Sequence, residues 1–532
     1  MTKAMAEPVA HRPAPPPASP KLRRFAIGSA AMAGCLLLTY IGRLFLGAIP
    51  YPPQIIQDVL RTVMPGKLDQ AAIRGLQHWA QRLLFIGVNL AVIAIGGYLA
   101  TLFTAGQTPR RRARNALIVA GALFAVSSVL ALTGNEGASW PAFLIYGVDG
   151  FLFARFASGT PLFRVLEPAV RTGEMPLDAI RRSRRSFLGR SAVIGGIAVL
   201  FGGALVKSLM RKSQKVTVVA ADHPFVPPPA DPNFPTIPGM LPEITANSDF
   251  YQVDIDSFLP PQIDVSSWSL TVGGLVTNPY SVDFTSLQKD FTTYELAHTL
   301  SCISNEVGGN LVSTAVWRGA RLLDVLNKGG LKPGVAEIVF AAADGYSDSI
   351  PMSWINAQPE SLIVFAMNGE PLPAAHGFPC RVIVPGLYGM KQPKWLTSIT
   401  AVNHHYNGYW EVRGWDQQAI MVTQSQIDVP QAGSSIALPS YLAGIAWAGV
   451  RGISLVEVSY DGGNSWMQTM LKRELSPVAW RLWAVPVAST GGSSRRVLVR
   501  ATDGTGAVQT GVQQQPEPDA ATGWDFVTFQ VS

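Results

Sequence analysis

Long apolar runs dominate the first 210 residues of the chain. Five of them have roughly the ~20 residues that an α-helix needs to cross a bilayer. They lie at 25–48, 83–105, 116–133, 139–156 and 187–209. The pattern predicts a transmembrane region with five helices at 25–210, preceded by a Pro- and Ala-rich, disordered cytoplasmic tail at 1–24. Asp149 falls inside the fourth run, where a carboxylate is either functional or locks neighbouring helices together.

The pattern changes after residue 210. Residues 211–245 are Pro-rich and predict an extended linker. Short runs then predict strands: SWSLTVGGL at 267–275, AEIVFAAAD at 336–344, SLIVFAM at 361–367 and CRVIVPG at 380–386. GARLLDVLNKGG at 319–330 predicts a short amphipathic helix that ends at glycine. This mixture predicts an α+β domain at 246–429.

Beyond this domain the pattern is all-β. ISLVEVSY at 453–460 and RVLVRAT at 496–502 alternate between apolar and polar residues, and DGGNSW at 461–466 predicts a hairpin turn. About 100 residues of this kind are typical of a small β-sandwich. We therefore expect a third folded part, a sandwich at 430–532.

Charge supports a membrane location. Charged residues make up only 14 % of the chain, against about 25 % in an average soluble protein. The net charge is +7, and basic residues cluster beside the apolar runs at 21–24, 109–114 and 181–186, which indicates membrane topology rather than nucleic-acid binding. With the N-terminus inside, all three clusters face the cytoplasm. We therefore expect a multi-pass cell-membrane protein whose domains after residue 210 are extracytoplasmic.

The fifth run follows SRRSFLGR at 183–190, which resembles a twin-arginine export signal. The alternative is a basic loop that happens to precede a helix, but the adjacent Phe187 and Leu188 favour the signal. Because that route carries folded proteins, the resemblance implies that the C-terminal part folds, and takes up any cofactor, in the cytoplasm.

Cys302 lies among small and polar residues in TLSCISNEVGG at 299–309. The three cysteines do not suggest a disulfide framework, and Cys380 is expected to fill the core of a strand. A thiolate is a ligand for redox metals and a nucleophile, but no protease pattern surrounds Cys302. From the residues alone, a metal ligand and a buried structural thiol remain equally open.

Several motifs in order around Cys302 resemble the sulfite oxidase family of molybdopterin enzymes. They are TLSCISNEVGG, STAVWRGARLLDVL, GYSDSIP and MNGEPLPAAHGFPCRVIVPGLYGMKQPKWL. GIAWAGVRGISLVEVSYDGGNSW at 444–466 and AWRLW at 479–483 resemble the family's immunoglobulin-like dimerisation domain. The resemblance covers 246–532 and implies a molybdenum–molybdopterin cofactor, two-electron oxo-transfer chemistry, and a homodimer.

The resemblance also assigns site residues by position. Cys302 matches the cysteine that binds molybdenum, and Tyr346 matches the tyrosine beside the metal's oxo group. The residues that match those holding the pterin and its phosphate are Phe250, Tyr251, Asp344, His376, Arg381, Lys391 and Lys394.

The substrate pocket departs from the family's pattern. Family members carry arginines shortly after the ligand cysteine, whereas this chain has Asn305, Glu306 and Val307. A carboxylate at Glu306 lining the site would repel a small dianion such as sulfite, although Glu306 could instead be a solvated charge or bond to backbone. Arg481 matches a pocket arginine of the family and would retain some positive charge. We expect an unknown small-molecule substrate other than sulfite, such as a neutral S- or N-oxide.

Other polar and aromatic residues are expected to be structural. His404 and His405 are adjacent and would point to opposite faces of a strand, so they do not suggest a metal pair. Trp395 and Trp410 are expected in the core.

Electron partners are not evident in the chain. It contains no cytochrome-b5-like segment, and none of the five apolar runs contains a histidine that could ligate haem. We expect the membrane part to anchor the enzyme or to dock a quinone or a separate cytochrome. Two alternatives stay open: a non-catalytic surface docking module that keeps the fold, and a redox subunit whose partner chain carries the substrate site.

Overall fold

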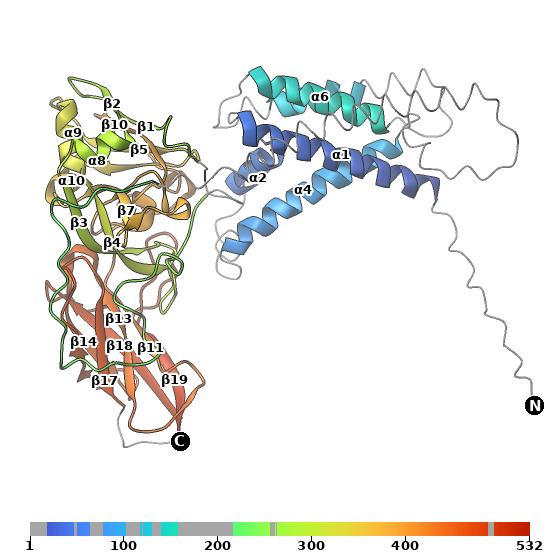
Figure 1. The fold of residues 1–532 in the computed structure, drawn as a ribbon. Helices are drawn as coiled ribbons and strands as arrows, with labels where there is room; N and C mark the ends of the chain where they lie inside the picture. Colours follow the sequence, from blue (N-terminus) through green and yellow to red (C-terminus); the bar gives the residue numbers. More distant parts are fainter. Residues whose placement is uncertain are drawn as a thin grey trace, which may run out of the picture. The chain divides into compact units, whose positions relative to one another are not determined.

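The structure is a computed structural model. It describes residues 19–46, 51–63, 78–102, 118–119, 121–129, 140–157, 216–255, 261, 263–487 and 494–532. The chain divides into two compact units, one N-terminal and helical and the other comprising the described residues from 216 onward. Each unit is described separately (Figure 1).

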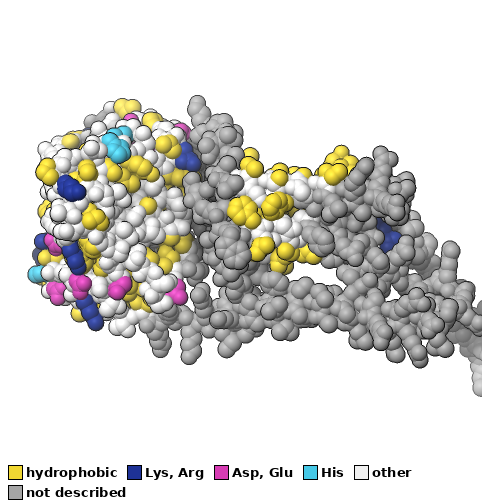
Figure 2. Space-filling view, turned by 90° about the horizontal axis from the view of Figure 1, so that it is seen from above, with side chains coloured by type: hydrophobic (Ala, Val, Ile, Leu, Met, Phe, Trp, Pro, Cys, Tyr) yellow, Lys and Arg dark blue, Asp and Glu magenta, His cyan; other side chains and the backbone are white. Residues whose placement is uncertain are grey.

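The N-terminal unit consists of apolar helices. They are α1 (Pro20–Leu46), α2 (Pro52–Val63), α4 (His78–Thr101) and α6 (Trp140–Ala157). α1 and α6 pack together, and Thr39 on α1 donates a hydrogen bond to the Asp149 carboxylate on α6. This contact agrees with a carboxylate that locks helices together. Large apolar side chains such as Leu90, Ile95 and Leu144 remain exposed on these helices. Figure 2 shows hydrophobic side chains on the surface of the helical unit.

The expectation of five membrane helices is not met within the described residues. Two helices there are long and apolar enough to cross a membrane, Lys21–Tyr40 and Leu83–Thr101. The fourth predicted run forms α6, which contains the charged Asp149 and Arg155. The third run is described only at 118–119 and 121–129, where it is helical. The fifth run and the twin-arginine-like segment lie outside the described residues.

The first part of the second unit is an α+β domain, as predicted. One sheet has the strand order β2-β1-β10-β5-β6 and the other β3-β4-β7-β8, with β9 also paired to β7. Their bounds are β1 (Ser269–Gly274), β2 (Tyr280–Asp283), β3 (Thr293–Ser301), β4 (Val312–Arg321), β5 (Glu337–Ala342), β6 (Ser347–Pro351), β7 (Leu362–Met367), β8 (Glu370–Pro371), β9 (Arg381–Ile383) and β10 (Leu396–Val402). β1 and β10 are parallel and the remaining pairs are antiparallel.

Short helices complete this domain. They are α8 (Phe284–Lys289), α9 (Leu322–Gly329) and α10 (Met352–Ala357). α9 lies within the predicted helical segment and ends where Gly330 adopts a positive φ, which favours glycine. Side chains of the sheets and helices share one core, in which Leu270, Phe340 and Phe365 are fully buried. The strands predicted at 267–275, 336–344, 361–367 and 380–386 all form.

The C-terminal part of this unit is β-rich, also as predicted. One sheet has the order β11-β13-β17-β16 and the other β12-β19-β18-β14-β15. The strands are β11 (Gln424–Val429), β12 (Ser435–Ile436), β13 (Tyr441–Trp447), β14 (Ile453–Ser459), β15 (Met467–Gln468), β16 (Met470–Leu471), β17 (Arg481–Pro486), β18 (Ser494–Asp503) and β19 (Asp525–Val531). Both sheets contribute to one core around Val456, Trp483 and Val499. An immunoglobulin-like topology stays a prediction. β11 begins ahead of the boundary predicted at 430.

The segment before β17 ties the C-terminal part to β3. The Trp480 amide donates to Thr299 Oγ1 at 2.6 Å, and the Thr299 amide donates to the Val478 carbonyl at 3.1 Å. β3 ends one residue before Cys302, so these bonds fix the base of the loop that carries this cysteine.

Candidate active site

A cavity opens in the α+β domain where several loops converge. It encloses roughly 860 Å³, including solvent at its mouth. Eight of the eleven predicted site residues line it: Phe250, Tyr251, Cys302, Asp344, Tyr346, His376, Arg381 and Lys394. They come from the segment before β1, the ends of β3 and β5, and the approaches to β9 and β10. Residues separated by more than 140 positions in the sequence therefore converge on one site.

Cys302 is presented by a tight loop. Its amide donates to the Leu311 carbonyl at 2.9 Å, and Asn305 Oδ1 accepts from the Leu311 amide at 2.8 Å. A Cβ at Gly309 would lie 2.5 Å from Asn305 Oδ1, so the loop closes only around a glycine. Cys302 forms no disulfide, and its Sγ lies 3.0 Å from Ser304 Oγ. Burial raises the pKa of the Cys302 thiol, and the Ser304 hydroxyl opposes this shift.

Arg381 places a buried positive charge on the cavity wall. Its Nη1 donates to the His376 carbonyl at 3.2 Å and its Nη2 to the Gln392 carbonyl at 3.1 Å, while Nε has no partner among the described residues. Burial lowers its pKa to about 10. A buried guanidinium held only by carbonyl oxygens costs free energy unless an anion joins it. This wall is therefore suited to a phosphate.

Lys394 adds a second cation to the same wall. Its Nζ lies 3.2 Å from Asp254 Oδ2 and donates to the Ala375 carbonyl at 3.2 Å. Burial is the main reason that its pKa falls below the usual value, and Asp254 opposes the shift. A lysine beside an unpaired guanidinium strengthens the attraction for a polyanion.

His376 and the aromatic residues form a flatter wall. His376 Nε2 lies 3.0 Å from the Asn247 carbonyl, which requires that Nε2 carry the proton. Burial lowers the pKa of His376 to about 4, so the ring is neutral near pH 7. Phe250 meets His376 edge-on at 5.4 Å and stacks on Tyr251 at 5.6 Å. Such a wall can hold a flat heterocycle.

Tyr346 stands in the turn that begins β6. Its amide donates to Asp344 Oδ1 at 3.0 Å, and its hydroxyl lies 2.7 Å from the Met390 carbonyl and 3.2 Å from Asp348 Oδ2. Burial, reinforced by Asp348, raises the pKa of Tyr346 well above its usual value. The phenol is therefore protonated at every relevant pH.

Three predicted site residues do not reach the cavity. Glu306 is exposed at the tip of the cysteine loop, because its backbone closes the turn with Gly309. Arg481 is held within the C-terminal part, where its Nε donates to the Lys472 carbonyl at 2.9 Å and Nη1 to the Ile453 carbonyl at 2.8 Å. These placements correct the expectation that Glu306 and Arg481 line the substrate pocket.

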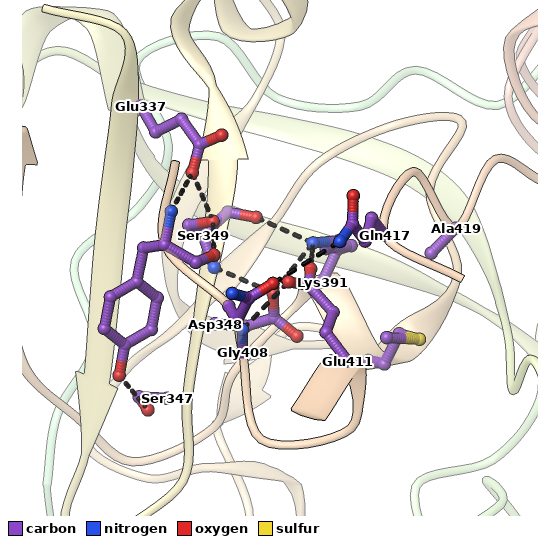
Figure 3. Close-up of polar contacts among 12 residues, drawn as sticks. Glu337, Ser347, Asp348, Ser349, Lys391, Gly408, Glu411, Gln417 and Ala419 are labelled. Carbon is purple, nitrogen blue, oxygen red and sulfur yellow. Dashed lines mark hydrogen bonds and ion pairs between the residues drawn. The ribbon is translucent and has the colours of Figure 1, made fainter. Parts of the chain in front are cut away.

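Lys391 is the third predicted site residue that does not line the cavity. Its ammonium group donates to the Asp348 carboxylate at 2.9 Å, to the Ser349 carbonyl at 3.0 Å and to the Glu411 carboxylate (Figure 3). All three donors are used within the protein, and Lys391 does not line the cavity. It therefore lies behind the site rather than on a pterin.

Sequence reasoning missed several residues around the site. Trp410, expected in the core, lines the cavity together with Trp415. Asp348 was not singled out, although it follows Tyr346 by two positions at the start of a strand, where side chains at this spacing share a face. Glu411 and the fully buried His298 were also missed. No local sequence signal marks these last two.

Comparison with known proteins identifies the family of the chain. Residues 257–410 match the oxidoreductase molybdopterin binding domain, and residues 416–516 match the Mo-co oxidoreductase dimerisation domain. The uncharacterized oxidoreductase YuiH of Bacillus subtilis is 34 % identical over 157 residues, which are 30 % of this chain and 76 % of that protein. The chain belongs to the sulfite oxidase family of molybdenum oxidoreductases.

Two eukaryotic enzymes are also similar to the chain. Mitochondrial sulfite oxidase of Rattus norvegicus is 32 % identical over 270 residues, covering 42 % of this chain and 49 % of that protein. Nitrate reductase [NADH] 1 of Oryza sativa subsp. japonica is 28 % identical over 306 residues, covering 46 % of this chain and 33 % of that protein. The chain thus spans about half the length, or less, of these relatives.

The cofactor of this sulfite oxidase family member is molybdenum–molybdopterin. The described residues fit it: Arg381 is buried with an unpaired Nε, which suits the pterin's phosphate. Lys394 would add charge there, Phe250 and His376 would flank the ring, and Cys302 would offer its sulfur to the metal. Thiolate, rather than thiol, binds metal, and a bound metal deprotonates a coordinating thiol despite its burial.

Proposed function

We propose that this chain is a membrane-anchored oxidoreductase that transfers an oxygen atom to or from a small, neutral substrate. The observation that carries the proposal is the cavity, in which Cys302, Tyr346 and the buried Arg381 share one lining. When bound, molybdenum–molybdopterin supplies the two-electron oxygen-atom chemistry. Cys302 would ligate the metal, Tyr346 offers a protonated phenol, and Trp410 lines the same cavity.

The charges at the cavity support a neutral substrate. The cations on its described lining are Arg381 and Lys394, which we assign to the phosphate of the pterin. The rest of the lining includes the carboxylates of Asp254 and Asp344 and the apolar side chains Leu300, Ile303 and Met390. With both cations of the described lining engaged by the pterin phosphate, neither would be left to bind a small dianion such as sulfite. An S- or N-oxide needs only a hydrogen-bond donor and an apolar surface.

Turnover of defined substrates tests this function. The full chain, purified in detergent and loaded with molybdenum, is assayed with reduced methyl viologen as electron donor and dimethyl sulfoxide or trimethylamine N-oxide as acceptor. Sulfite is assayed with ferricyanide in the opposite direction. We expect turnover of an oxide, little sulfite oxidation, and loss of turnover in Cys302→Ser. Rapid sulfite oxidation, or an active Cys302→Ser, would contradict the proposal.

The helical unit provides the proposed membrane anchor. α1 and α4 supply two candidate spans, and apolar side chains remain exposed on the helices. We propose that the domains after residue 210 lie on the extracytoplasmic face, exported through the twin-arginine-like segment, and that a quinone or a separate cytochrome exchanges electrons with the enzyme. Changing Arg184 and Arg185 to lysine should leave the folded domain inside the cell, where added protease cannot reach it. Normal export of this variant would argue against the twin-arginine route.

Dimerisation through the C-terminal part is also proposed. Its support is the match of residues 416–516 to a dimerisation domain. Mass measurement of the detergent-solubilised chain by light scattering should give a dimer, and a monomer at micromolar concentration would contradict it.

A further inference from the structure

A buried cluster of charges lies directly behind Tyr346. Lys391 sits between two carboxylates, Asp348 and Glu411, and the three side chains are 2 %, 0 % and 0 % exposed (Figure 3). Asp348 also accepts from the Ser349 amide at 2.7 Å. A Cβ at Gly408 would lie within 2.7 Å of the Asp348 carboxylate oxygens, so the backbone there closes tightly over this group.

The cluster connects the cavity with the protein surface. On the cavity side, the Tyr346 hydroxyl lies 3.2 Å from Asp348 Oδ2. On the outer side, Glu411 Oε2 lies 3.9 Å from Nε2 of His405, whose side chain is 45 % exposed. Hydrogen bonds therefore link Tyr346, Asp348, Lys391 and Glu411 in series. His405 follows Glu411 across 3.9 Å, a separation that a proton crosses only through a bridging water. We call this series the relay.

The charges of the relay allow it to hold one further proton. One ammonium group between two carboxylates leaves a net charge of −1, so a proton taken up there neutralises the cluster. Burial raises the pKa of Asp348 to about 6, with Lys391 opposing the shift. Burial alone would lower the pKa of Lys391, but Asp348 and Glu411 raise it overall, so Lys391 stays charged at rest.

His405 is placed to exchange protons with solvent. Its Nδ1 lies 2.7 Å from Glu337 Oε1 and its Nε2 lies 3.1 Å from Asn407 Oδ1. The hydrogen bond to Glu337 is the main reason that the pKa of His405 is raised, and burial opposes it. The charged groups that face His405 are thus Glu337 and Glu411, both acidic. Histidine is the side chain best suited to exchange protons with water at such a surface site, and the two acidic neighbours favour its protonated form.

We propose that the relay carries protons between Tyr346 in the cavity and His405 at the surface. The inference rests on the proposed oxygen-atom transfer, because moving oxygen between water and a substrate exchanges two protons for every two electrons. A one-electron carrier would supply or accept the electrons, and the relay moves only protons. Asp348, Lys391 and Glu411 act through Tyr346 and are positioning residues.

Each step is a proton shift that breaks no bond between heavy atoms. A proton released in the cavity binds the Tyr346 oxygen while the phenol proton moves to Asp348 Oδ2, leaving Tyr346 neutral and Asp348 protonated. The Asp348 carboxyl group then rotates to present this proton to Lys391, which accepts it as one of its own ammonium protons moves to Glu411 Oε1. Both ring nitrogens of His405 face oxygen acceptors, so His405 first releases a proton to solvent and then takes up the proton of Glu411 through a bridging water. Proton uptake runs the same steps in reverse.

Two variants and one matched control test the relay. Asp348→Asn keeps the shape of the side chain but removes the proton acceptor. His405→Gln removes the imidazole that exchanges the proton with solvent. His404→Gln is the control, because His404 is the adjacent exposed histidine and its ring bonds to neighbouring Asn403. Molybdenum and pterin contents of the full chain in detergent are measured first. Stopped-flow absorbance then follows oxidation of reduced methyl viologen by the loaded protein between pH 5 and 9.

We expect unchanged cofactor contents in all variants. Asp348→Asn should slow the electron uptake at least tenfold and abolish the slowing that wild type shows in deuterated buffer. His405→Gln should slow it severalfold above pH 7, and added imidazole should restore the rate. His404→Gln should behave as wild type. A cluster that only stabilises the fold would change unfolding without moving the pH profile or responding to imidazole.

Two results would overturn the relay. One is wild-type rates and pH profiles in both Asp348→Asn and His405→Gln, and the other is equal slowing in His404→Gln and His405→Gln. Should Asp348→Asn fail to fold, the two histidine variants and imidazole decide alone. A wild-type protein that carries no molybdenum would instead overturn the proposed function, so the two failures are distinguishable.

Discussion

His298 should make the cofactor-free protein unusually sensitive to mild acid. Its side chain lies on β3 with no exposed surface, and neither ring nitrogen has a hydrogen-bond partner among the described residues. Burial, reinforced by the positive charge of Arg381, lowers its pKa to about 3. The ring is therefore neutral in the folded protein, whereas in the unfolded chain it takes up a proton below about pH 6.5.

The sign and size of the effect follow from proton linkage. A histidine whose pKa is lowered by folding contributes its full stability above the unfolded pKa, and this contribution is lost as the pH falls towards the folded pKa. Between pH 7 and pH 5 the loss from His298 alone is about 2 kcal/mol. His376, whose pKa is also lowered, adds to the total loss in the same pH range.

Comparison with His298→Leu isolates this contribution, because leucine has a similar volume and does not titrate. The full chain is produced in cells that cannot make the pterin and is unfolded with urea in detergent at pH 7, 6 and 5. Wild type should lose about 2 kcal/mol more of its unfolding free energy than the variant between pH 7 and 5. Equal losses in the two proteins would refute the assignment of a neutral, unpaired histidine.

Three further substitutions have defined outcomes. Lys391→Met leaves Asp348 and Glu411 buried without their cation, so urea unfolding at pH 7 should show a loss of about 3–5 kcal/mol; a loss below 1 kcal/mol would contradict this. Gly408→Ala places a Cβ within 2.7 Å of the Asp348 carboxylate oxygens, and we expect a lower melting temperature with a cavity that still binds pterin. Arg481→Gln should leave the KM for the oxide substrate unchanged, because Arg481 donates its hydrogen bonds within the C-terminal part. A tenfold higher KM would show that Arg481 lines the substrate pocket after all.

The strands and the cavity wall were predictable because local patterns mark them. Alternating or continuous apolar runs predicted β1, β5, β7 and β9. β1 and β5 alternate in burial over most of their length, whereas β7 and β9 are buried throughout. The family-like motifs contain five of the eight cavity residues, namely Cys302, Tyr346, His376, Arg381 and Lys394. Phe250, Tyr251 and Asp344 lie outside those motifs and were matched by their position relative to them. The position within a motif was enough to place Cys302 and Arg381 in the cavity wall, because Cys302 directly follows β3 and Arg381 begins β9.

The directions in which loop and turn side chains point could not be predicted in the same way. Glu306 follows the cysteine closely, but the turn closed by Gly309 points it to solvent. Lys391 lies three residues before Lys394, yet the two ammonium groups face different partners because a 3-10 turn at Gly389–Lys391 separates their directions. The relay depends on contacts between β6, this turn and residues 405–411, and such contacts leave no periodic pattern in the sequence.

Elemental and pterin analysis of the purified full chain tests the central claim most directly. Wild type is compared with Cys302→Ser and with Cys380→Ser, a matched control because Cys380 is fully buried and lies outside the cavity lining. The account predicts near-stoichiometric molybdenum and pterin in wild type and Cys380→Ser, and in Cys302→Ser loss of sulfur ligation by the protein, seen in the molybdenum X-ray absorption spectrum. Well-folded wild type without molybdenum, or an unchanged spectrum in Cys302→Ser, would contradict it.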